Sequence, residues 1–164
     1  MAHPRLLDRP LTCAVLTVSD SRTPDTDHSG SLIQTRLAAA GHGIHDYRIV
    51  ADEPNLIRAL VLQWGQDSAL DAVIVNGGTG IAPRDTTYDA LEALLEKTLP
   101  GFGEIFRQLS FQEIGSRAMA SRAVAGVYQG KVLFSLPGSS KAVTLAMDAL
   151  ILPELPHLIS LLRG

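Results

Sequence analysis

Val73-Ile74-Val75-Asn76-Gly77-Gly78-Thr79-Gly80 is the stretch of sequence that decides the fold. Three β-branched residues in a row predict a buried strand, and the glycine-dense turn after them predicts a loop of exposed backbone. Glycines let main-chain N–H groups approach an anion because no Cβ stands in the way. Helix-like residues follow from Tyr88 to Leu99, so the loop is expected at the carboxyl edge of a sheet, where open α/β folds bind ligands. Taken alone, the loop fits equally well a tight turn that needs glycine only for its dihedral angles.

The bulk composition is that of one globular domain. The chain has 164 residues, of which 46% are hydrophobic and 19% charged, and this is enough for a full core. The net charge is −3 without a cluster of Lys and Arg, so no nucleic-acid partner is expected. Residues 1–10 lack the apolar segment of a signal peptide, and no stretch approaches the ~18 unbroken apolar residues of a membrane span. A cytoplasmic protein with no membrane partner is therefore expected.

Several familiar kinds of site lack their motifs here. The single cysteine, Cys13, lies in an apolar run and is expected to be a small buried hydrophobe. The histidines have no zinc spacing, and no Walker lysine follows the glycine loop. The glycines follow the wrong strand for a Rossmann fingerprint, and no nucleophile elbow supports hydrolase chemistry.

Strands and helices alternate along the chain and predict an α/β fold around a mostly parallel sheet. A β-hairpin is expected as well, because Gln129-Gly130 is a two-residue turn signal. Residues 1–11 are expected to form a flexible arm and residues 12–164 a single domain. The predicted strands are 12–18, 44–50, 72–76, 123–128 and 131–136. The predicted helices are 29–40, capped by Ser29, a helix ending near Gly65, 88–99, 104–112 after a break at 100–103, 141–152, and 154–162 after a break at Pro153.

Three polar loops follow three of the apolar strands. They are Ser19-Asp20, the loop from Gly77 to Asp85, and the loop from Pro137 to Ser140. Strand ends that share a direction meet at one edge of a parallel sheet, so the three loops together predict a ligand cradle. Each of them taken alone is also compatible with a plain turn.

Two acids and four basic residues stand near these loops. Asp52 and Asp85 fit a divalent cation that bridges carboxylate and phosphate, but their spacing alone slightly favours two helix N-terminal acids that interact with the helix dipole. Arg22, Arg84, Arg122 and Lys141 fit phosphate neutralisation, although for each residue alone a solvated surface charge is the favoured interpretation. The residue types by themselves leave both interpretations open.

The motifs taken together resemble the MoaB/MogA family of molybdenum cofactor biosynthesis, which also includes the G domain of gephyrin. The match runs in order from about Thr12 to Pro153. The segment 109–115 resembles the MoaB branch in particular. The matching motifs are Thr17-Val18-Ser19-Asp20-Ser21, Asp27-His28-Ser29-Gly30, Asn76-Gly77-Gly78-Thr79-Gly80, Pro83-Arg84-Asp85, Pro100-Gly101-Phe102-Gly103-Glu104, Ser121-Arg122-Ala123, Ala125-Gly126 and Pro137-Gly138-Ser139.

The resemblance implies a three-layer αβα sandwich, a homotrimer or homohexamer, and molybdopterin adenylyltransferase activity with Mg²⁺ and ATP. A molybdenum insertase is an implied partner. Asp52 and Asp85 match the family's catalytic acids and are the expected Mg²⁺ ligands. The expected substrate- and nucleotide-binding residues are Ser19, Asp20, Gly77, Gly78, Thr79, Gly80, Ser121, Arg122, Pro137, Gly138 and Ser139. Tyr88 and Ser140 stand where many relatives have proline, but Asp85 is kept, which favours catalysis.

Other functions remain open at this point. A non-catalytic MoaB paralogue would bind or carry molybdopterin without pyrophosphate release. Related domains occur in molybdenum insertases and CinA-type proteins, but usually beside further domains. A pure oligomeric scaffold would not need three glycine-bearing loops at one sheet edge.

Overall fold

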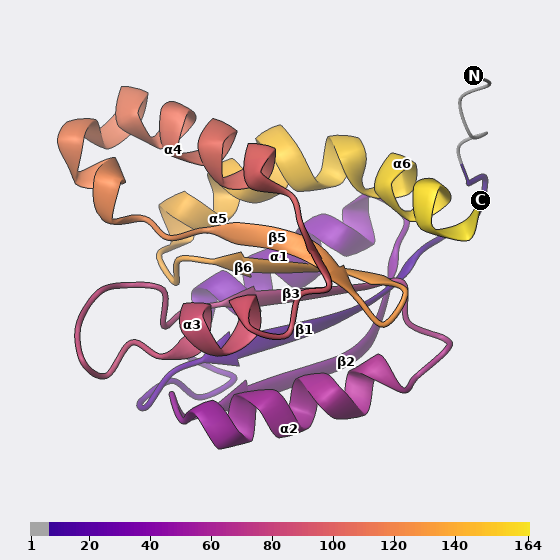
Figure 1. Ribbon diagram of the computed structural model, residues 1–164, viewed down its shortest axis with the longest axis horizontal. Coiled ribbons are helices and arrows are strands. Elements are labelled where there is room, and N and C mark those ends of the chain that lie inside the picture. The colour runs from indigo at the N-terminus through magenta and orange to yellow at the C-terminus, as the bar shows by residue number, and fades with distance from the viewer. Residues whose placement is uncertain (1–6) are drawn as a thin grey trace.

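The computed structural model describes residues 7–164 and contains one six-stranded sheet (Figure 1). The strand order is β2-β1-β3-β6-β5-β4. Its parallel strands are β1 (Thr12–Val18), β2 (Gly43–Val50), β3 (Ala72–Asn76) and β6 (Lys131–Leu136). The hairpin strand β5 (Val124–Tyr128) runs antiparallel to β6. Gln129 and Gly130 in the turn both have positive φ, +48° and +72°, as a type I′ turn requires. The predicted mostly parallel sheet with an antiparallel hairpin strand is confirmed.

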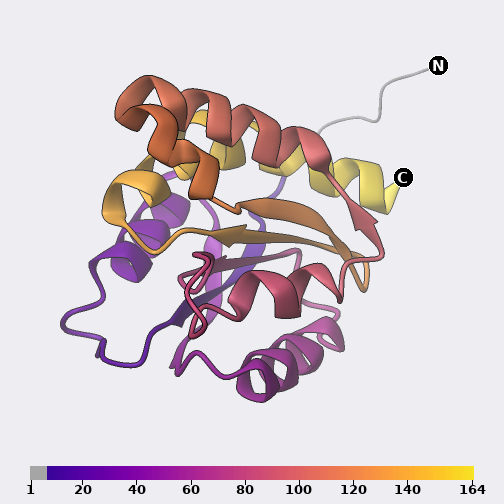
Figure 2. The ribbon, with the colours of Figure 1, turned by 60° about the vertical axis from the view of Figure 1, so that its left-hand side comes forward.

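Helices cover both faces of the sheet and complete the three expected layers (Figures 1 and 2). Side chains alternate between faces along each strand, so Ile74 enters one apolar cluster while Val73 and Val75 enter the other. One face is covered by α2 (Pro54–Gly65) and α3 (Thr87–Glu92). The other is covered by α1 (His28–Ala39), α4 (Pro100–Ile114), α5 (Ser140–Ala146) and α6 (Leu152–Arg163).

The central strands end in register. Asn76, the last residue of β3, is paired with Thr17 on one side and with Leu136 on the other. The amide of Gly77 then donates to the carbonyl of Leu136 at 2.9 Å. The loops that follow β1, β3 and β6 therefore begin side by side at one edge of the sheet, as the sequence predicts.

The helix predicted for residues 88–99 is wrong in its second half. Helix α3 ends at Glu92, and the chain continues as the short strand β4 (Lys97–Thr98) beside β5. Backbone bonds from Glu96 to Val127 and from Leu99 to Ala125 fix this edge. Pairing with a strand that comes later in the chain outweighs the local helical pattern.

The predicted break at 100–103 is also wrong, because α4 begins at Pro100. Proline suits the first turn of a helix, where its missing N–H has no partner to lose. Gly103 lies inside this helix, and a larger residue would not fit there, because its Cβ would come within 2.7 Å of the carbonyl oxygen of Ala123. The N-cap of α1 is Asp27 rather than Ser29, and the Asp27 side chain accepts from the amide of Gly30.

Pro153 does not split the C-terminal helices. A π-helical turn at Met147–Ile151, in which Leu152 N–H donates to the Met147 carbonyl, joins α5 and α6 into one helical run. Pro153 stands in the first turn of α6, where its missing N–H costs no helical hydrogen bond. The run is 24 residues long with a mean hydropathy of 1.5, which is enough to span a membrane by length and composition. Its inner face, including Val143, Met147 and Ile159, is nevertheless buried in the domain core.

A flexible arm is predicted for residues 1–11, and residues 1–6 of it lie outside the described residues. From residue 7 onward the chain is attached to the domain. Leu11 is fully buried, and the guanidinium of Arg9 forms two bonds, 2.8 and 2.9 Å long, with the carboxylate of Asp71. Arg163, in the last turn of α6, bonds to the same carboxylate at 3.2 Å.

Candidate functional site

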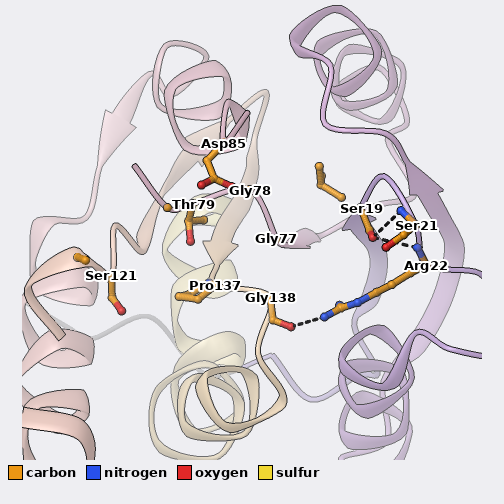
Figure 3. Close-up of a pocket in the computed structure, with 13 residues that line it drawn as sticks. Ser19, Ser21, Arg22, Gly77, Gly78, Thr79, Asp85, Ser121, Pro137 and Gly138 are labelled. Atoms are coloured by element: carbon orange, nitrogen blue, oxygen red, sulfur yellow. Dashed lines mark hydrogen bonds between the residues drawn. The ribbon is translucent and has the colours of Figure 1, made fainter. Parts of the chain in front are cut away.

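A cavity of about 480 Å³ opens at the carboxyl edge of the sheet, where the three loops meet (Figure 3). Most of its lining is glycine backbone and small polar side chains, with one carboxylate and one guanidinium. The lining residues are Val18, Ser19, Ser21, Arg22, Gly77, Gly78, Thr79, Gly80, Asp85, Ala120, Ser121, Pro137 and Gly138. The predicted cradle at this edge is therefore present.

The glycine loop has a conformation that other residues rarely adopt. Gly77 and Gly78 have φ of +100° and +67°, a region in which glycine pays no Cβ penalty. A Cβ on Gly77 would also collide with the carbonyl oxygen of Val18. The glycines are thus needed both for their dihedral angles and for the close approach of neighbouring chain segments.

Arg22 connects the loop after β1 to the loop after β6. Its guanidinium donates to the carbonyl of Gly138 at 3.0 Å (Figure 3). It also donates to Oγ of Ser29 at 2.6 Å. It lies 3.6 Å from the buried carboxylate of Asp27. Arg22 lines the cavity. The sequence names it as a candidate for phosphate neutralisation, but the family resemblance does not include it among the binding residues. Its position in the polar loop after β1 is the signal that points to it.

Asp27 is held as an anion beneath this loop. Burial opposes ionisation, but hydrogen bonds from Thr17, Tyr47 and the Gly30 amide, with the nearby charge of Arg22, lower the pKa of its carboxyl overall. The charge on Asp27 balances that of Arg22 and leaves the guanidinium fixed at the cavity wall.

Arg122 binds the backbone of the glycine loop from outside the cavity lining. It donates to the carbonyls of Thr79 and Gly80 at 3.0 and 2.6 Å, and pairs with the carboxylate of Asp89 at 3.0 Å. Its guanidinium also stacks 4.7 Å from the ring centroid of Tyr88. Arg122 was expected to bind substrate, but it does not line the cavity. Its contacts instead fix the two carbonyls of the loop.

The two expected catalytic acids both lie against the glycine loop. Asp85 lines the cavity, and its Oδ2 accepts from the amide of Ala82 at 3.1 Å. A Cβ on Gly80 would lie 2.6 Å from that same oxygen. One carboxylate thus stands at the cavity wall beside the loop backbone.

Asp52 is buried, with 6% of its surface exposed, and does not line the cavity. Its Oδ1 accepts from the amide of Thr86 at 3.2 Å and from the Thr86 hydroxyl at 2.6 Å. Its Oδ2 faces Gly78, where a Cβ would be 2.5 Å away. Both acids lie against one loop, but only Asp85 lines the cavity.

The other expected residues divide in the same way. Ser121, Pro137 and Gly138 line the cavity, and Oγ of Ser19 accepts from the amides of Ser21 and Arg22 at 3.2 and 3.0 Å. Asp20 lies outside the cavity lining and pairs with Arg84. Ser139 caps α5 by accepting from the amide of Ala142. It also lines a second cavity of about 360 Å³, which shares Ser121 and Pro137 with the first.

The arrangement suits a polyanion. Glycine backbone, small hydroxyls and a guanidinium are groups that bind phosphate. Within residues 7–164 no three His, Cys, Asp or Glu side chains gather into a site that would hold a metal by themselves. A cation here would depend on oxygens that a ligand brings, as Mg²⁺ usually does at phosphate sites.

Comparison with known proteins places the chain in a family. The family described as "probable molybdopterin binding domain" matches residues 14–157. Molybdenum cofactor biosynthesis protein B from Bacillus subtilis is 55% identical over 152 residues, which cover 92% of this chain and 89% of that protein.

Solved structures show the same relationship. The crystal structure of a molybdenum cofactor biosynthesis protein B has a TM-score of 0.92 with 48% identity, and covers 96% of this chain and 98% of its own. The tungsten cofactor synthesizing protein MoaB from Pyrococcus furiosus has a TM-score of 0.86 with 34% identity, and covers 96% and 100%. The fold, the order of the motifs and these relatives agree: the chain belongs to the MoaB/MogA family of molybdenum cofactor biosynthesis proteins.

Proposed function

We propose that the protein transfers an adenylyl group from Mg-ATP to molybdopterin and releases pyrophosphate. The observation that carries the proposal is the meeting of glycine backbone, the Arg22 guanidinium and the Asp85 carboxylate in one cavity at the carboxyl edge of the sheet. That lining fits two phosphate-bearing substrates better than an apolar ligand.

The reaction needs little acid–base help from the protein. An oxygen of the terminal phosphate of molybdopterin attacks the α-phosphorus of ATP, a new P–O bond forms, and the bond to the pyrophosphate oxygen breaks. The nucleophile is already anionic, so the main obstacle is repulsion between two polyanions. Catalysis is then mostly alignment and charge neutralisation.

Asp85 is the residue that would hold Mg²⁺, because its carboxylate lies on the cavity wall and one or two carboxylates with phosphate oxygens are a usual ligand set. When bound, the cation neutralises charge on the triphosphate and on the departing pyrophosphate. Asp52 fits this role less well, since it lies outside the cavity lining and Thr86 donates two hydrogen bonds to its Oδ1. We assign Asp52 to positioning the loop.

The remaining lining residues divide between binding and support. The backbone of residues 77–80, the Ser19, Thr79 and Ser121 hydroxyls and the Arg22 guanidinium would hold phosphate groups. Ser139 would contact the part of the substrate that extends into the second cavity. Asp20 and Arg122 would act from outside the cavity by holding the loops.

The quaternary structure and cellular setting belong to the same proposal. A homotrimer or homohexamer in the cytoplasm is the expected assembly, with a molybdenum insertase as the partner that receives the product. Exposed apolar side chains on and beyond α4, among them Ile105, Phe111 and Met119, supply surface that a subunit interface would cover.

The test is a pyrophosphate-release assay with the purified protein, MgATP and molybdopterin. Adenylyl-molybdopterin and pyrophosphate are expected in equal amounts, and omission of molybdopterin should abolish release. Tight molybdopterin binding without pyrophosphate would reject the transferase and select the non-catalytic carrier instead.

A further inference from the structure

The residue before Asp85 is tied to two other loops. The Arg84 guanidinium donates from Nε and Nη2 to both carboxylate oxygens of Asp20, at 2.8 and 2.9 Å, and from Nη1 to Glu53 at 2.7 Å. Asp20 belongs to the loop after β1, and Glu53 belongs to the loop after β2. One planar side chain therefore joins three loops, and its fork geometry suits this arrangement.

The residue after Asp85 is tied to the same region. Thr86 donates from its amide and its hydroxyl to Oδ1 of Asp52. The amide of Asp52 in turn donates to Oδ1 of Asp20 at 3.0 Å. Arg84 and Thr86, the residues on either side of Asp85, thus belong to one hydrogen-bonded network, in which Asp20, Asp52 and Glu53 accept through their carboxylates.

The segment that carries Asp85 has little other support. Ile81 is 79% exposed, and residues 82–84 are exposed as well. Inside the segment, Ala82 and Asp85 exchange two bonds: the Asp85 amide donates to the Ala82 carbonyl at 2.9 Å, and the Ala82 amide donates to Oδ2 of Asp85 at 3.1 Å. A segment with so few buried contacts depends on its anchors for a fixed shape.

We infer that Arg84 is a positioning residue, which aims the carboxylate of Asp85 at the cavity through its bonds to Asp20 and Glu53. Arg84 does not line the cavity, and two carboxylates occupy its guanidinium. The inference rests on the proposed function, because it assigns Asp85 a task in catalysis. It also gives Asp20 and Glu53, neither of which lines the cavity, a supporting role as acceptors for Arg84.

The experiment compares Arg84→Gln, Arg84→Lys and Glu53→Gln with Arg48→Gln. Arg48 is a matched control, since it is 59% exposed against 56% for Arg84 and also pairs with an aspartate, Asp46. In Arg84→Gln we expect kcat to fall at least ~10-fold, since displaced catalytic groups cost about that much or more. The KM values for ATP and molybdopterin should stay within about twofold. Arg84→Lys and Glu53→Gln should keep part of the activity, because each retains some of the bonds.

Two kinetic outcomes would overturn the inference. A rise in KM with unchanged kcat would mean that Arg84 contacts substrate directly. Kinetics equal to those of Arg48→Gln would mean that the anchor has no effect on Asp85. Glu53→Gln serves as the second variant if Arg84→Gln does not fold.

Amide hydrogen exchange of the segment 80–86 separates this inference from the proposed function. Exchange should be faster in Arg84→Gln and Glu53→Gln than in Arg48→Gln, whether or not the wild-type protein releases pyrophosphate. An inactive wild-type protein would reject the transferase function without touching the role of Arg84. Unchanged amide exchange in both Arg84→Gln and Glu53→Gln would reject the positioning role of Arg84.

Discussion

Oδ2 of Asp52 lies where a side chain on Gly78 would have to go, 2.5 Å from the position of a Cβ. Gly78 also has φ of +67°, so any other residue is strained as well as blocked. We expect Gly78→Ala to lower the free energy of unfolding by roughly 1–3 kcal/mol and to abolish turnover. Denaturant unfolding and the pyrophosphate assay measure the two effects. Gly101→Ala is the control, because a Cβ there has no atom within 4 Å. Equal stability of the two variants would contradict the steric argument.

Asp85→Asn should abolish pyrophosphate release and leave the fold and molybdopterin binding largely intact. The amide keeps the shape and can still accept from Ala82, but it loses the charge that would hold a divalent cation. Circular dichroism and molybdopterin titration check the intact functions. Asp8→Asn, an exposed change that precedes β1, should behave like wild type. Normal rates in Asp85→Asn would refute the catalytic role.

Arg122→Lys should loosen the glycine loop without unfolding the domain. A lysine cannot donate simultaneously to Thr79, Gly80 and Asp89 in the fork geometry of arginine, and it loses the stacking contact with Tyr88. We expect kcat/KM to fall ~10-fold and amide exchange of residues 77–80 to accelerate. Arg36→Lys, which alters an exposed pair with Asp148, is the comparison. Identical exchange in both variants would speak against the bracing role of Arg122.

Asp71 should make stability depend on pH in the acid range. Burial opposes its ionisation, but bonds from Arg9, the Thr12 amide and Arg163 lower the pKa of its carboxyl to about 2. A lowered folded-state pKa gives stability that is present above the unfolded value near 4 and is lost as the pH falls towards 2. The loss should be about 2 kcal/mol. Unfolding of wild type and Asp71→Asn between pH 5 and 2 tests this, and the same slope in both would contradict it.

Alkylation of the Cys13 thiol should report only the unfolding of the domain. Its side chain is fully buried on β1, and burial, aided by the charge of Asp71, raises the pKa of its thiol to about 12. The thiolate is the reactive form, so an alkylating reagent at pH 8 should label the folded protein only through opening of the core. Labelling should become rapid above the unfolding midpoint. Fast labelling under native conditions would mean that the strand is accessible without unfolding.

Sequence patterns predict the parts of this molecule that depend on neighbours in the chain. The strand endings at Val18, Asn76 and Leu136 and the turn at Gln129-Gly130 are local signals, and they are sufficient to predict the cavity edge. The end of α3 is not local, because it depends on pairing with β5, which lies about thirty residues further on.

The roles of individual polar residues are less predictable for the same reason. Arg22 meets the carbonyl of Gly138, 116 residues away, and Asp52 meets Thr86, 34 residues away. Family resemblance selects Asp52 as an acid of the site, but only the fold shows that its Oδ1 already accepts two hydrogen bonds from Thr86. Charged residues can be placed near a site from sequence, whereas their partners require coordinates.

The shared contact of Arg9 and Arg163 with Asp71 has a practical consequence for handling the protein. Both residues bond to Asp71, which precedes β3 at the amino edge of the sheet, whereas the cavity lies at the carboxyl edge. In Figure 1 the C-terminus lies on the right, at the opposite end of the sheet from the loop between β3 and α3. A fluorescent label, an affinity tag or a surface tether attached after Gly164 would therefore leave the entrance for ligands unobstructed. Immobilised protein oriented in this way would suit binding measurements with scarce, oxygen-sensitive pterins.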